Sequence, residues 1–146
     1  RLFASGQAGE RFAVRNSGSL AIVEGCGAHG GEYMTGGTTI ILGQVGDNFG
    51  AGMTGGISFV NDIKNNFEDF VNSTSIIWQK IETEYWIKYV KSLIQEHCSE
   101  TNSELSKKII DNFKNEILNF VQVCPKEMID KLENSITLKP VIKEVS

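Results

Sequence analysis

A repeat with a period of 19 residues constrains the fold of this chain more than any other feature of its sequence. Gly18, Gly37 and Gly56 are spaced by 19 positions, and Met34-Thr35-Gly36-Gly37 returns as Met53-Thr54-Gly55-Gly56. An apolar run follows each of these sites, at Leu20–Val23, Ile40–Leu42 and Ile57–Val60. A fixed period of this length with one apolar run per unit is typical of repeat proteins, whose units stack because none buries its apolar face alone.

The repeat predicts a mainly β fold. Each unit is expected to hold two short strands and two corners, and each strand is expected to pair with its equivalent in the next unit. The predicted architecture is a parallel β-helix, a solenoid with coils of about 19 residues. Leu2–Ala4 is in register as the first rung, and Ile22 is expected to lie directly over Ile41. The second strands are predicted at Phe12–Val14, Glu32–Met34 and Phe49–Met53.

Glycine is predicted at the corners of this coil for a steric reason. A corner needs a residue that tolerates positive φ, or one without a Cβ where neighbouring rungs approach closely. The structural turn glycines assigned on this basis are Gly18, Gly25, Gly27, Gly36, Gly37, Gly46, Gly55 and Gly56.

The distribution of glycine divides the chain into two parts. All 15 glycines lie before residue 57. We therefore predict a glycine-rich β-helix domain at residues 1–66 and a C-terminal capping segment at residues 67–146, mostly helical with short strands. Because the sequence starts at Arg1, without a methionine and inside a repeat unit, we expect an N-terminally truncated domain and a fragment of a longer protein.

The second part shows helical periodicity. Apolar residues recur on one face from Glu84 to His97, and a second stripe follows the capping pair Asn102-Ser103. That stripe consists of Leu105, Ile109, Phe113, Ile117 and Phe120. Short strands are expected at Ile76–Ile81 and Val121–Val123, a last helix from Pro125 to about Leu132, and a loose tail at Asn134–Ser146. Phe67–Val71 is either a helical turn or a strand that returns antiparallel to Ser58–Val60.

Charge and cysteine usage narrow the functional classes. The net charge is −4, shared evenly by the two parts, so no basic field is present to attract nucleic acid. The sequence has no secretory signal, lipidation signal or apolar run of membrane length, and we expect a soluble, cytoplasmic protein with no membrane partner. Cys26, Cys98 and Cys124 are odd in number and far apart, which predicts reduced thiols.

One segment has the spacing of a nucleotide-binding motif. Gly25–Gly30 reads G-x-G-x-x-G and follows an apolar run, but that motif requires a helix to begin at its third glycine. The seven residues Gly31–Gly37 that follow are too few and too glycine-bounded for a helix. These glycines also belong to the 19-residue register, so the sequence argues against a dinucleotide site.

Few other residues suggest chemistry. His29 aligns with Glu10 and Asn48 in the repeat, and this column is either a hydrogen-bonded ladder or a binding site. His97 ends a helix, where a structural role is expected. Arg15 precedes a turn and is expected to bond turn carbonyls or a neighbouring domain. The acidic residues Glu10, Glu24, Glu32 and Asp47 fall at different points of the register, unlike the clustered carboxylates of carbohydrate enzymes. No catalytic, cofactor-binding or metal-binding residue is assigned.

Several segments carry a resemblance to a known family. The first of them are Gly9–Gly18, Val23–Gly25, Glu32–Gly37, Asn48-Phe49 and Ala51–Gly56. They closely resemble the C-terminal domain of the glutamate synthase large (alpha) subunit, the glycine-rich GXGXG domain. The resemblance weakens over Asn61–Tyr85 and returns in Leu93–His97, Ile110–Phe113 and Phe120–Pro125. The sequence departs from the family at Ala28 and Gly31, where Asp and Cys are usual.

The resemblance implies a right-handed coil and a structural scaffold that carries no catalytic residue. The family's enzyme is an oxidoreductase of glutamate biosynthesis. It releases ammonia from glutamine in one domain and uses it in another for the reductive amination of 2-oxoglutarate. By this resemblance the chain is no enzyme by itself and holds no cofactor, since FMN and an iron–sulfur cluster belong to other parts of the parent enzyme.

The implied partners are the other domains of the large subunit, and the open N-terminal coil also predicts self-association. The alternative is a free-standing interaction subunit of an oxidoreductase complex, as in formylmethanofuran dehydrogenase.

Overall fold

The structure, a computed structural model, describes residues 2–4, 6, 8–10, 12–13, 16–132 and 136. Its strands are β1 (Leu2–Phe3), β2 (Ser17–Val23), β3 (Thr35–Ile41), β4 (Gly55–Asn61), β5 (Ile76–Lys80) and β6 (Phe120–Pro125). Its α-helices are α1 (Glu84–Thr101), α2 (Glu104–Asp111) and α3 (Phe113–Glu116), and the 3-10 helices are η1 (Phe67–Asp69), η2 (Ile117–Asn119) and η3 (Lys126–Lys131). Two predictions, the contacts of Arg15 and the loose tail at Asn134–Ser146, fall on residues outside this set, apart from Ile136.

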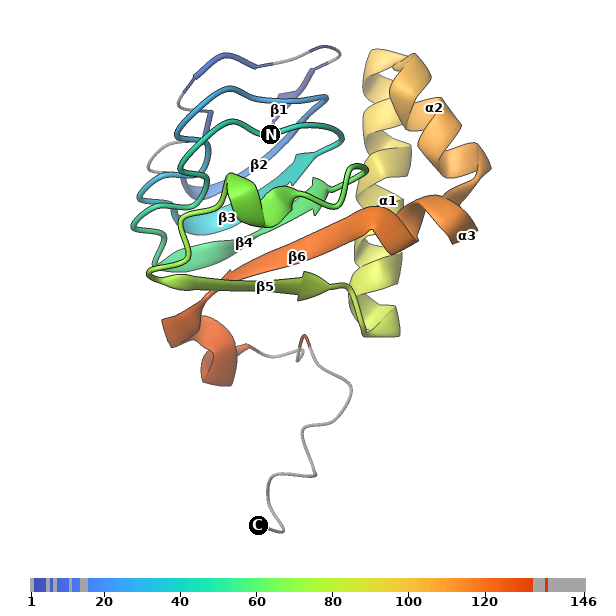
Figure 1. Ribbon diagram of the computed structural model, residues 1–146. Coiled ribbons are helices and arrows are strands. Elements are labelled where there is room, and N and C mark those ends of the chain that lie inside the picture. The colour runs from blue at the N-terminus through green and yellow to red at the C-terminus, as the bar shows by residue number, and fades with distance from the viewer. Residues whose placement is uncertain are drawn as a thin grey trace, which may run out of the picture.

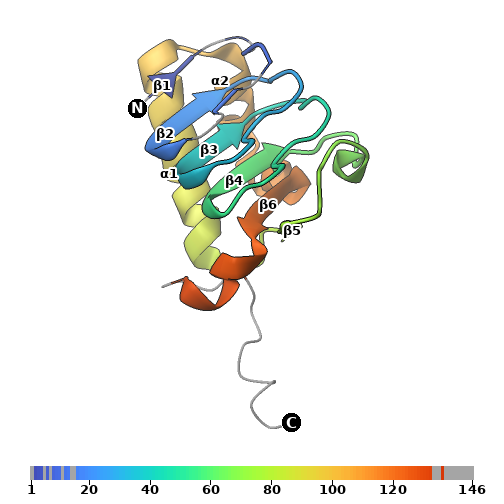
Figure 2. The same ribbon diagram turned by 90° about the vertical axis from the view of Figure 1, so that its left-hand side faces the viewer.

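All six strands belong to one open sheet in the order β1-β2-β3-β4-β6-β5. The first four strands are parallel, whereas β6 pairs antiparallel with both β4 and β5. Figure 2 shows β1 to β4 lying side by side with β6 below them. Strands from the second part of the sequence therefore continue the sheet built by the first part.

The predicted mainly β fold, a right-handed parallel β-helix or solenoid followed by a helical segment, is wrong. In the residues that the structure describes, the chain has a mixed α/β fold with one open mixed sheet and three α-helices. A coil of strands needs a second strand in each unit, but residues 32–34 and 49–52 form turns and one isolated bridge. Because Tyr33 and Gly50 have φ values of +55° and +77°, the backbone reverses there and does not extend as a ladder.

The 19-residue spacing sets most of the register between neighbouring strands, with an irregularity in each of the β2–β3 and β3–β4 pairings. Leu2 pairs with Ala21, and Ile40 pairs with Phe59, both 19 positions apart. The pairing of β2 with β3 contains a register irregularity, so Ile22 lies beside Ile40 and not beside Ile41 as predicted. An extra residue on one strand of a pair produces such a shift, and the repeat in the sequence gives no sign of it.

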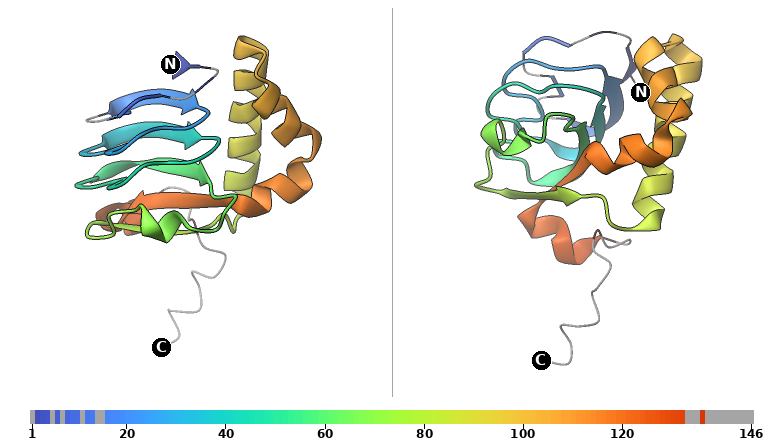
Figure 3. Two further views of the ribbon diagram at one scale, coloured as in Figure 1. Left: turned by 45° about the horizontal axis from the view of Figure 1, so that its top comes forward. Right: turned by 45° about the vertical axis from the view of Figure 1, so that its right-hand side comes forward.

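The two faces of the sheet are covered differently. One face carries Ile22, Ile40 and Phe59, which pack against Trp86 and Val90 of α1. The loops between the strands cover the opposite face. Buried side chains of these loops and of the strands form a second core cluster there. That cluster includes Met34, Val45, Phe49, Met53, Val60 and Val123. Figures 1 and 3 show the helices on one side of the sheet, with α1 running across several strands.

The helix predicted from Glu84 to His97 is confirmed and extends one turn further. The side chain of Thr83 accepts the backbone N–H of Trp86 at 3.4 Å, and the helix ends at Asn102 with φ +55°. The second predicted stripe does not form one helix. It is divided between α2, α3 and η2, and its last residue, Phe120, begins β6.

The structure decides between the two predictions for Phe67–Val71. Phe67–Asp69 is a 3-10 turn, and Val71 makes an isolated parallel bridge with Phe49, so this segment is not an antiparallel return strand. The helix predicted after Pro125 is present as the 3-10 helix η3. The strand predicted at Ile76–Ile81 is confirmed as β5.

We expect the Ser103→Ala variant to lose about 1–2 kcal/mol of unfolding free energy, because an N-cap and a buried hydrogen bond disappear together. Ser103 is buried, accepts the backbone N–H of Ser106 at 3.1 Å and donates to the Glu24 carboxylate at 2.5 Å. Urea unfolding followed by circular dichroism measures the change. The control is Ser99→Ala, on the exposed surface of α1, which should leave the midpoint unchanged or raise it slightly. Equal midpoints for both variants would contradict the assignment of the cap.

Candidate functional site

The segment with nucleotide-motif spacing does not form a phosphate-binding loop. Gly25 forms a bridge, residues 26–27 have no regular structure and residues 28–33 form turns, so no helix begins after the third glycine. The backbone N–H groups of Cys26, Gly27 and His29 donate to carbonyls of neighbouring loops, at Gln44, Gly9 and Asp47, over 2.7–3.1 Å. Amides engaged in this way are not free to bind a pyrophosphate. The glycines serve close contact between loops, since a Cβ on Gly30 would lie 3.0 Å from the Phe49 ring of the next loop.

The aligned polar column does not assemble into a site. His29 Nδ1 lies 2.8 Å from Glu32 Oε2, a local contact within its own loop. In the part of the chain that the structure describes, His29 makes no side-chain hydrogen bond with Glu10 or Asn48. His29 and Asn48 instead share a backbone feature, with φ values of +64° and +61° at the same point of successive loops.

A buried hydrogen-bond network ties the helices to the sheet. His97 is fully buried, and its Nδ1 lies 2.6 Å from the Ser106 hydroxyl while its Nε2 lies 3.0 Å from the Ala4 carbonyl. The second contact assigns Nε2 as the donor, so Nδ1 accepts from Ser106. Glu24 extends the network through Ser103. A histidine and a serine at this distance resemble a nucleophile pair, but both are fully buried and closed to a substrate.

Buried polar side chains also connect neighbouring strands. The hydroxyls of Thr39 and Ser58 lie 2.5 Å apart in adjacent strands, and Asn61 Nδ2 donates to the Leu42 carbonyl at 3.2 Å. Each pair is separated by 19 positions and buried. Because buried polar groups are costly without partners, these bonds fix the register of the sheet.

The predicted turn glycines occupy different environments. Gly37 and Gly56 have φ values of +87° and +82°. A Cβ on Gly36, Gly46 or Gly55 would overlap backbone atoms of the preceding loop or strand, and one on Gly27 would lie 3.2 Å from Glu10. Gly18 has nothing within 4 Å of an added Cβ, and the Gly25 carbonyl accepts the backbone N–H of Ala8 at 2.8 Å. The glycines thus line the contacts between loops and do not converge on one site.

The thiols offer no reactive centre. Burial raises the pKa of Cys26 from 9.0 to about 11, although a backbone hydrogen bond with Gly46 partly opposes this, and burial raises the pKa of Cys124 to about 11 as well. All three cysteines are free thiols. Among the described residues no group of three or more His, Cys, Asp or Glu side chains could hold a metal ion. Likewise, no helix in this part of the chain is long and apolar enough to cross a membrane.

We expect iodoacetamide at pH 8 to label Cys98 well before Cys26 and Cys124, because the thiolate is the reacting form and these two thiols are buried. Intact mass and peptide mapping over time measure the order, and labelling of all three in urea is the control. The raised pKa values also predict a loss of stability at high pH. The unfolded chain releases these thiol protons at a lower pH than the folded chain does. The two thiols therefore contribute fully to the free energy of unfolding below pH 9.0, and this contribution is lost as the pH rises to about 11. Equal labelling rates would contradict the buried placement.

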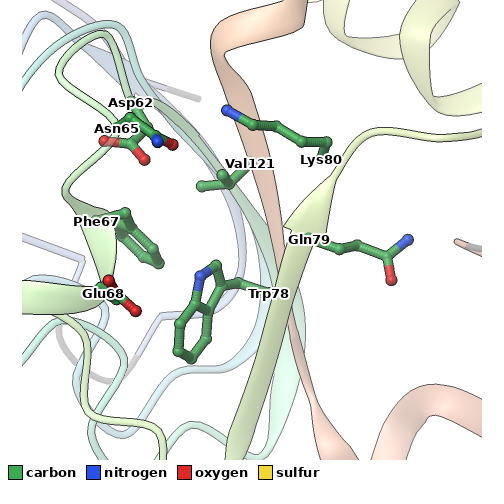
Figure 4. Close-up of a pocket in the computed structure, with 8 residues that line it drawn as sticks. All are labelled: Asp62, Asn65, Phe67, Glu68, Trp78, Gln79, Lys80 and Val121. Carbon is green, nitrogen blue, oxygen red and sulfur yellow. The ribbon is translucent and has the colours of Figure 1, made fainter.

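One cavity brings together side chains that the sequence does not connect. It has a volume of about 260 Å³ and lies between η1 and β5. Phe67 and Trp78 face each other across it in edge-to-face contact, with ring centroids 5.9 Å apart, and Val121 lies between the two walls (Figure 4). Asp62, Asn65, Glu68 and Lys80 also line it, while the Gln79 side chain points away. No sequence pattern predicted this pocket, because its walls come from segments that meet only when β5 joins the sheet.

Comparison with known proteins places this fold in a family. The family model described as "GXGXG motif" matches residues 1–126. The chain is 51% identical over 142 residues to the glutamate synthase (NADPH) large chain of Azospirillum brasilense, covering 97% of the chain and 9% of that relative. It is 42% identical to the glutamate synthase (NADH) of Schizosaccharomyces pombe over 98% of the chain and 7% of that relative.

A third relative, the glutamate synthase (NADPH) large chain of Bacillus subtilis, is 44% identical over 85% of the chain and 8% of its own length. The chain therefore spans less than a tenth of the length of these curated relatives. The family match and the similarity confirm the resemblance to the GXGXG domain of glutamate synthase large chains. The chain belongs to the GXGXG family.

Proposed function

We propose that this chain is a non-catalytic scaffold domain of a glutamate synthase large chain, an oxidoreductase in which other domains hold FMN and the iron–sulfur cluster. The observation that supports this most is that side chains of catalytic types are occupied in hydrogen bonds inside the fold. His97, Ser106, Glu24 and Ser103 are used in one network that joins the helices to the sheet. A network of this kind positions backbone segments and uses its own acid–base groups in internal hydrogen bonds.

The size of the relatives supports the same proposal. Nine-tenths or more of each relative lies outside the region matched here, which leaves room for the domains that bind cofactors and substrates. The proposed partners are those domains of the same large chain. The sheet and α1 give the chain a rigid body of its own, because both faces of the sheet carry a buried apolar cluster.

The scaffold proposal is tested by reconstitution with a relative. The Azospirillum large chain is prepared without its matching segment, and the present chain is added in trans or fused in its place. We expect the added chain to restore glutamate formation, and the chain alone to bind no stoichiometric FMN and to turn over no glutamine.

A His29→Ala/Glu32→Ala double variant serves as a second arm of this test. It removes a partly exposed histidine–carboxylate pair, with side-chain exposures of 35% and 19%, and should restore activity as well as the natural sequence does. Flavin bound by the isolated chain with glutamine turnover, or loss of activity in a folded double variant, would overturn the scaffold assignment.

We also expect the isolated chain to associate with itself at high concentration. β1 is the edge strand on one side of the sheet, whose order begins β1-β2-β3. An unpaired edge presents N–H and C=O groups to another chain. Sedimentation velocity across a hundredfold concentration range measures the association, and Phe3→Pro, which removes an N–H from the edge strand, should reduce it. A monomer throughout the range would contradict this expectation.

A further inference from the structure

The pocket between η1 and β5 carries polar groups that the fold itself leaves without partners. Asp62 is only 9% exposed, and one carboxylate oxygen accepts the backbone N–H of Asn66 at 2.9 Å. Within the described residues the other oxygen has no hydrogen-bond or ion-pair partner. Asp62 lines the pocket, so this oxygen is available to a hydrogen-bond donor that enters it, and a charged donor would bind it most strongly.

Three further polar groups line the pocket and are exposed or partly exposed to solvent. Among the residues that the structure describes, Glu68 and Lys80 form no ion pair, and the indole N–H of Trp78 has no acceptor. Lys80 extends from β5 toward the wall that carries Asp62 and Asn65 (Figure 4), yet makes no ion pair with Asp62. The pocket therefore presents two free acceptor groups and two free donor groups around one space.

The signs of these charges decide what the space can hold. An anion would meet the carboxylates of Asp62 and Glu68, and a cation would meet the ammonium of Lys80. A molecule that carries both charges satisfies both walls at once. Its apolar part would lie against Phe67, Trp78 and Val121, and an ammonium beside aromatic rings gains additional attraction.

The volume limits the size of such a molecule. A space of about 260 Å³ lies just below the range of about 300–1,000 Å³ that holds drug-sized ligands. A free amino acid is of the right order. We propose that this pocket binds a small zwitterion, a free α-amino acid, with its ammonium at Asp62 and Glu68 and its carboxylate at Lys80 and the Trp78 N–H.

This proposal does not rest on the scaffold function. The groups that carry it lie in the Asn61–Asp69 region and in β5, and none of them belongs to the His97 network. Either proposal can fail while the other holds.

The test is a titration of the full 146-residue chain followed by nuclear magnetic resonance of its indole N–H signals. The probes are L-glutamine, L-leucine, N-acetyl-L-glutamine and L-glutaminamide. The third lacks the ammonium, and the fourth lacks the carboxylate. Trp78→Phe assigns the Trp78 signal, which is distinguished in this way from Trp86. We expect the Trp78 signal to shift with at least one of the two free amino acids, and to shift much less with the blocked analogues.

The variants separate the two walls of the pocket. Asp62→Asn keeps an acceptor for the Asn66 N–H and removes the charge, and Lys80→Met keeps the length of the side chain. Each should weaken binding by about tenfold or more, the scale of one charge-assisted contact. Glu104→Gln and Lys108→Met, on exposed positions of α2, are the matched controls and should leave the affinity unchanged.

Each outcome decides the proposal. Shifts confined to free amino acids, and lost in both pocket variants with unchanged thermal melting, would establish the site. Equal binding of L-glutaminamide would make it a site for cations, and equal binding of N-acetyl-L-glutamine a site for anions. Either result, or no shift with any probe at millimolar concentration, would overturn the zwitterion proposal.

Discussion

The Gly37→Ala variant is expected to unfold at a much lower urea concentration than the natural chain, with a loss of about 3 kcal/mol or more. Gly37 has φ +87°, a conformation that costs a residue with a Cβ. Its Cβ would also overlap the carbonyl oxygen of Ser19 and lie 2.9 Å from both side-chain polar atoms of Asn16. Asn16 accepts the N–H groups of Gly18 and Ser19, so the clash disturbs that turn as well.

Gly18→Ala is the matched control for this prediction. Gly18 holds the same place in the repeat, 19 positions earlier, yet its added Cβ would have nothing within 4 Å, and its φ is not positive. Ala at such a site should change stability by about 1 kcal/mol or less, with a stabilising sign where the strand geometry is relaxed. Urea unfolding of the two variants under identical conditions measures the difference. Equal losses would show that the repeat position, and not the local backbone, sets the requirement for glycine.

Phe59→Ala is expected to cost about 3–5 kcal/mol, because it opens a cavity where the sheet meets α1. Phe59 is fully buried, and its ring centroid lies 5.9 Å from that of Trp86 and 6.1 Å from that of Tyr89. A loss of this size is close to the whole stability of many small domains. We therefore expect α1 to detach or the chain to unfold at room temperature.

Circular dichroism and the fluorescence of Trp86 report the Phe59→Ala result. Leu118→Ala is the control, since Leu118 is 67% exposed and its truncation removes little buried contact. Phe59→Leu keeps most of the apolar volume and should be intermediate. A Phe59→Ala variant as stable as the Leu118→Ala variant would mean that α1 does not depend on this contact.

The positions of the strands in the first part were predictable because each apolar run is local. Leu20–Val23 and Ile57–Val60 lie inside β2 and β4. The predicted second strands were wrong for a specific reason. Met34 and Phe49 are fully buried, but they lie in the loops between strands, Met34 just after a turn and Phe49 in an isolated bridge. An apolar side chain is buried equally well from a turn as from a strand, so apolar spacing does not distinguish them.

The second apolar stripe was divided for a related reason. Leu105 and Ile109 share a face of α2, as the spacing predicts, and Phe113 of α3 joins them in the same apolar cluster as α1. Phe120 has the same spacing but belongs to β6, which pairs with the free edge of β4. Pairing with an available strand edge outweighed helical periodicity over the last residues of the stripe.

By itself, the sequence determined the repeat, the glycine positions, the main strands and helix α1, as well as the family resemblance. These depend on the spacing and chemistry of residues close together in the chain. The tertiary structure alone decided that the sheet stays open, that β6 and β5 extend it beyond β4 in antiparallel pairing, and that Ile22 lies beside Ile40. It also brought Asp62, Trp78 and Lys80 around one pocket. Pairing and packing between distant segments depend on which edges and faces remain free after folding, and no local pattern encodes that competition.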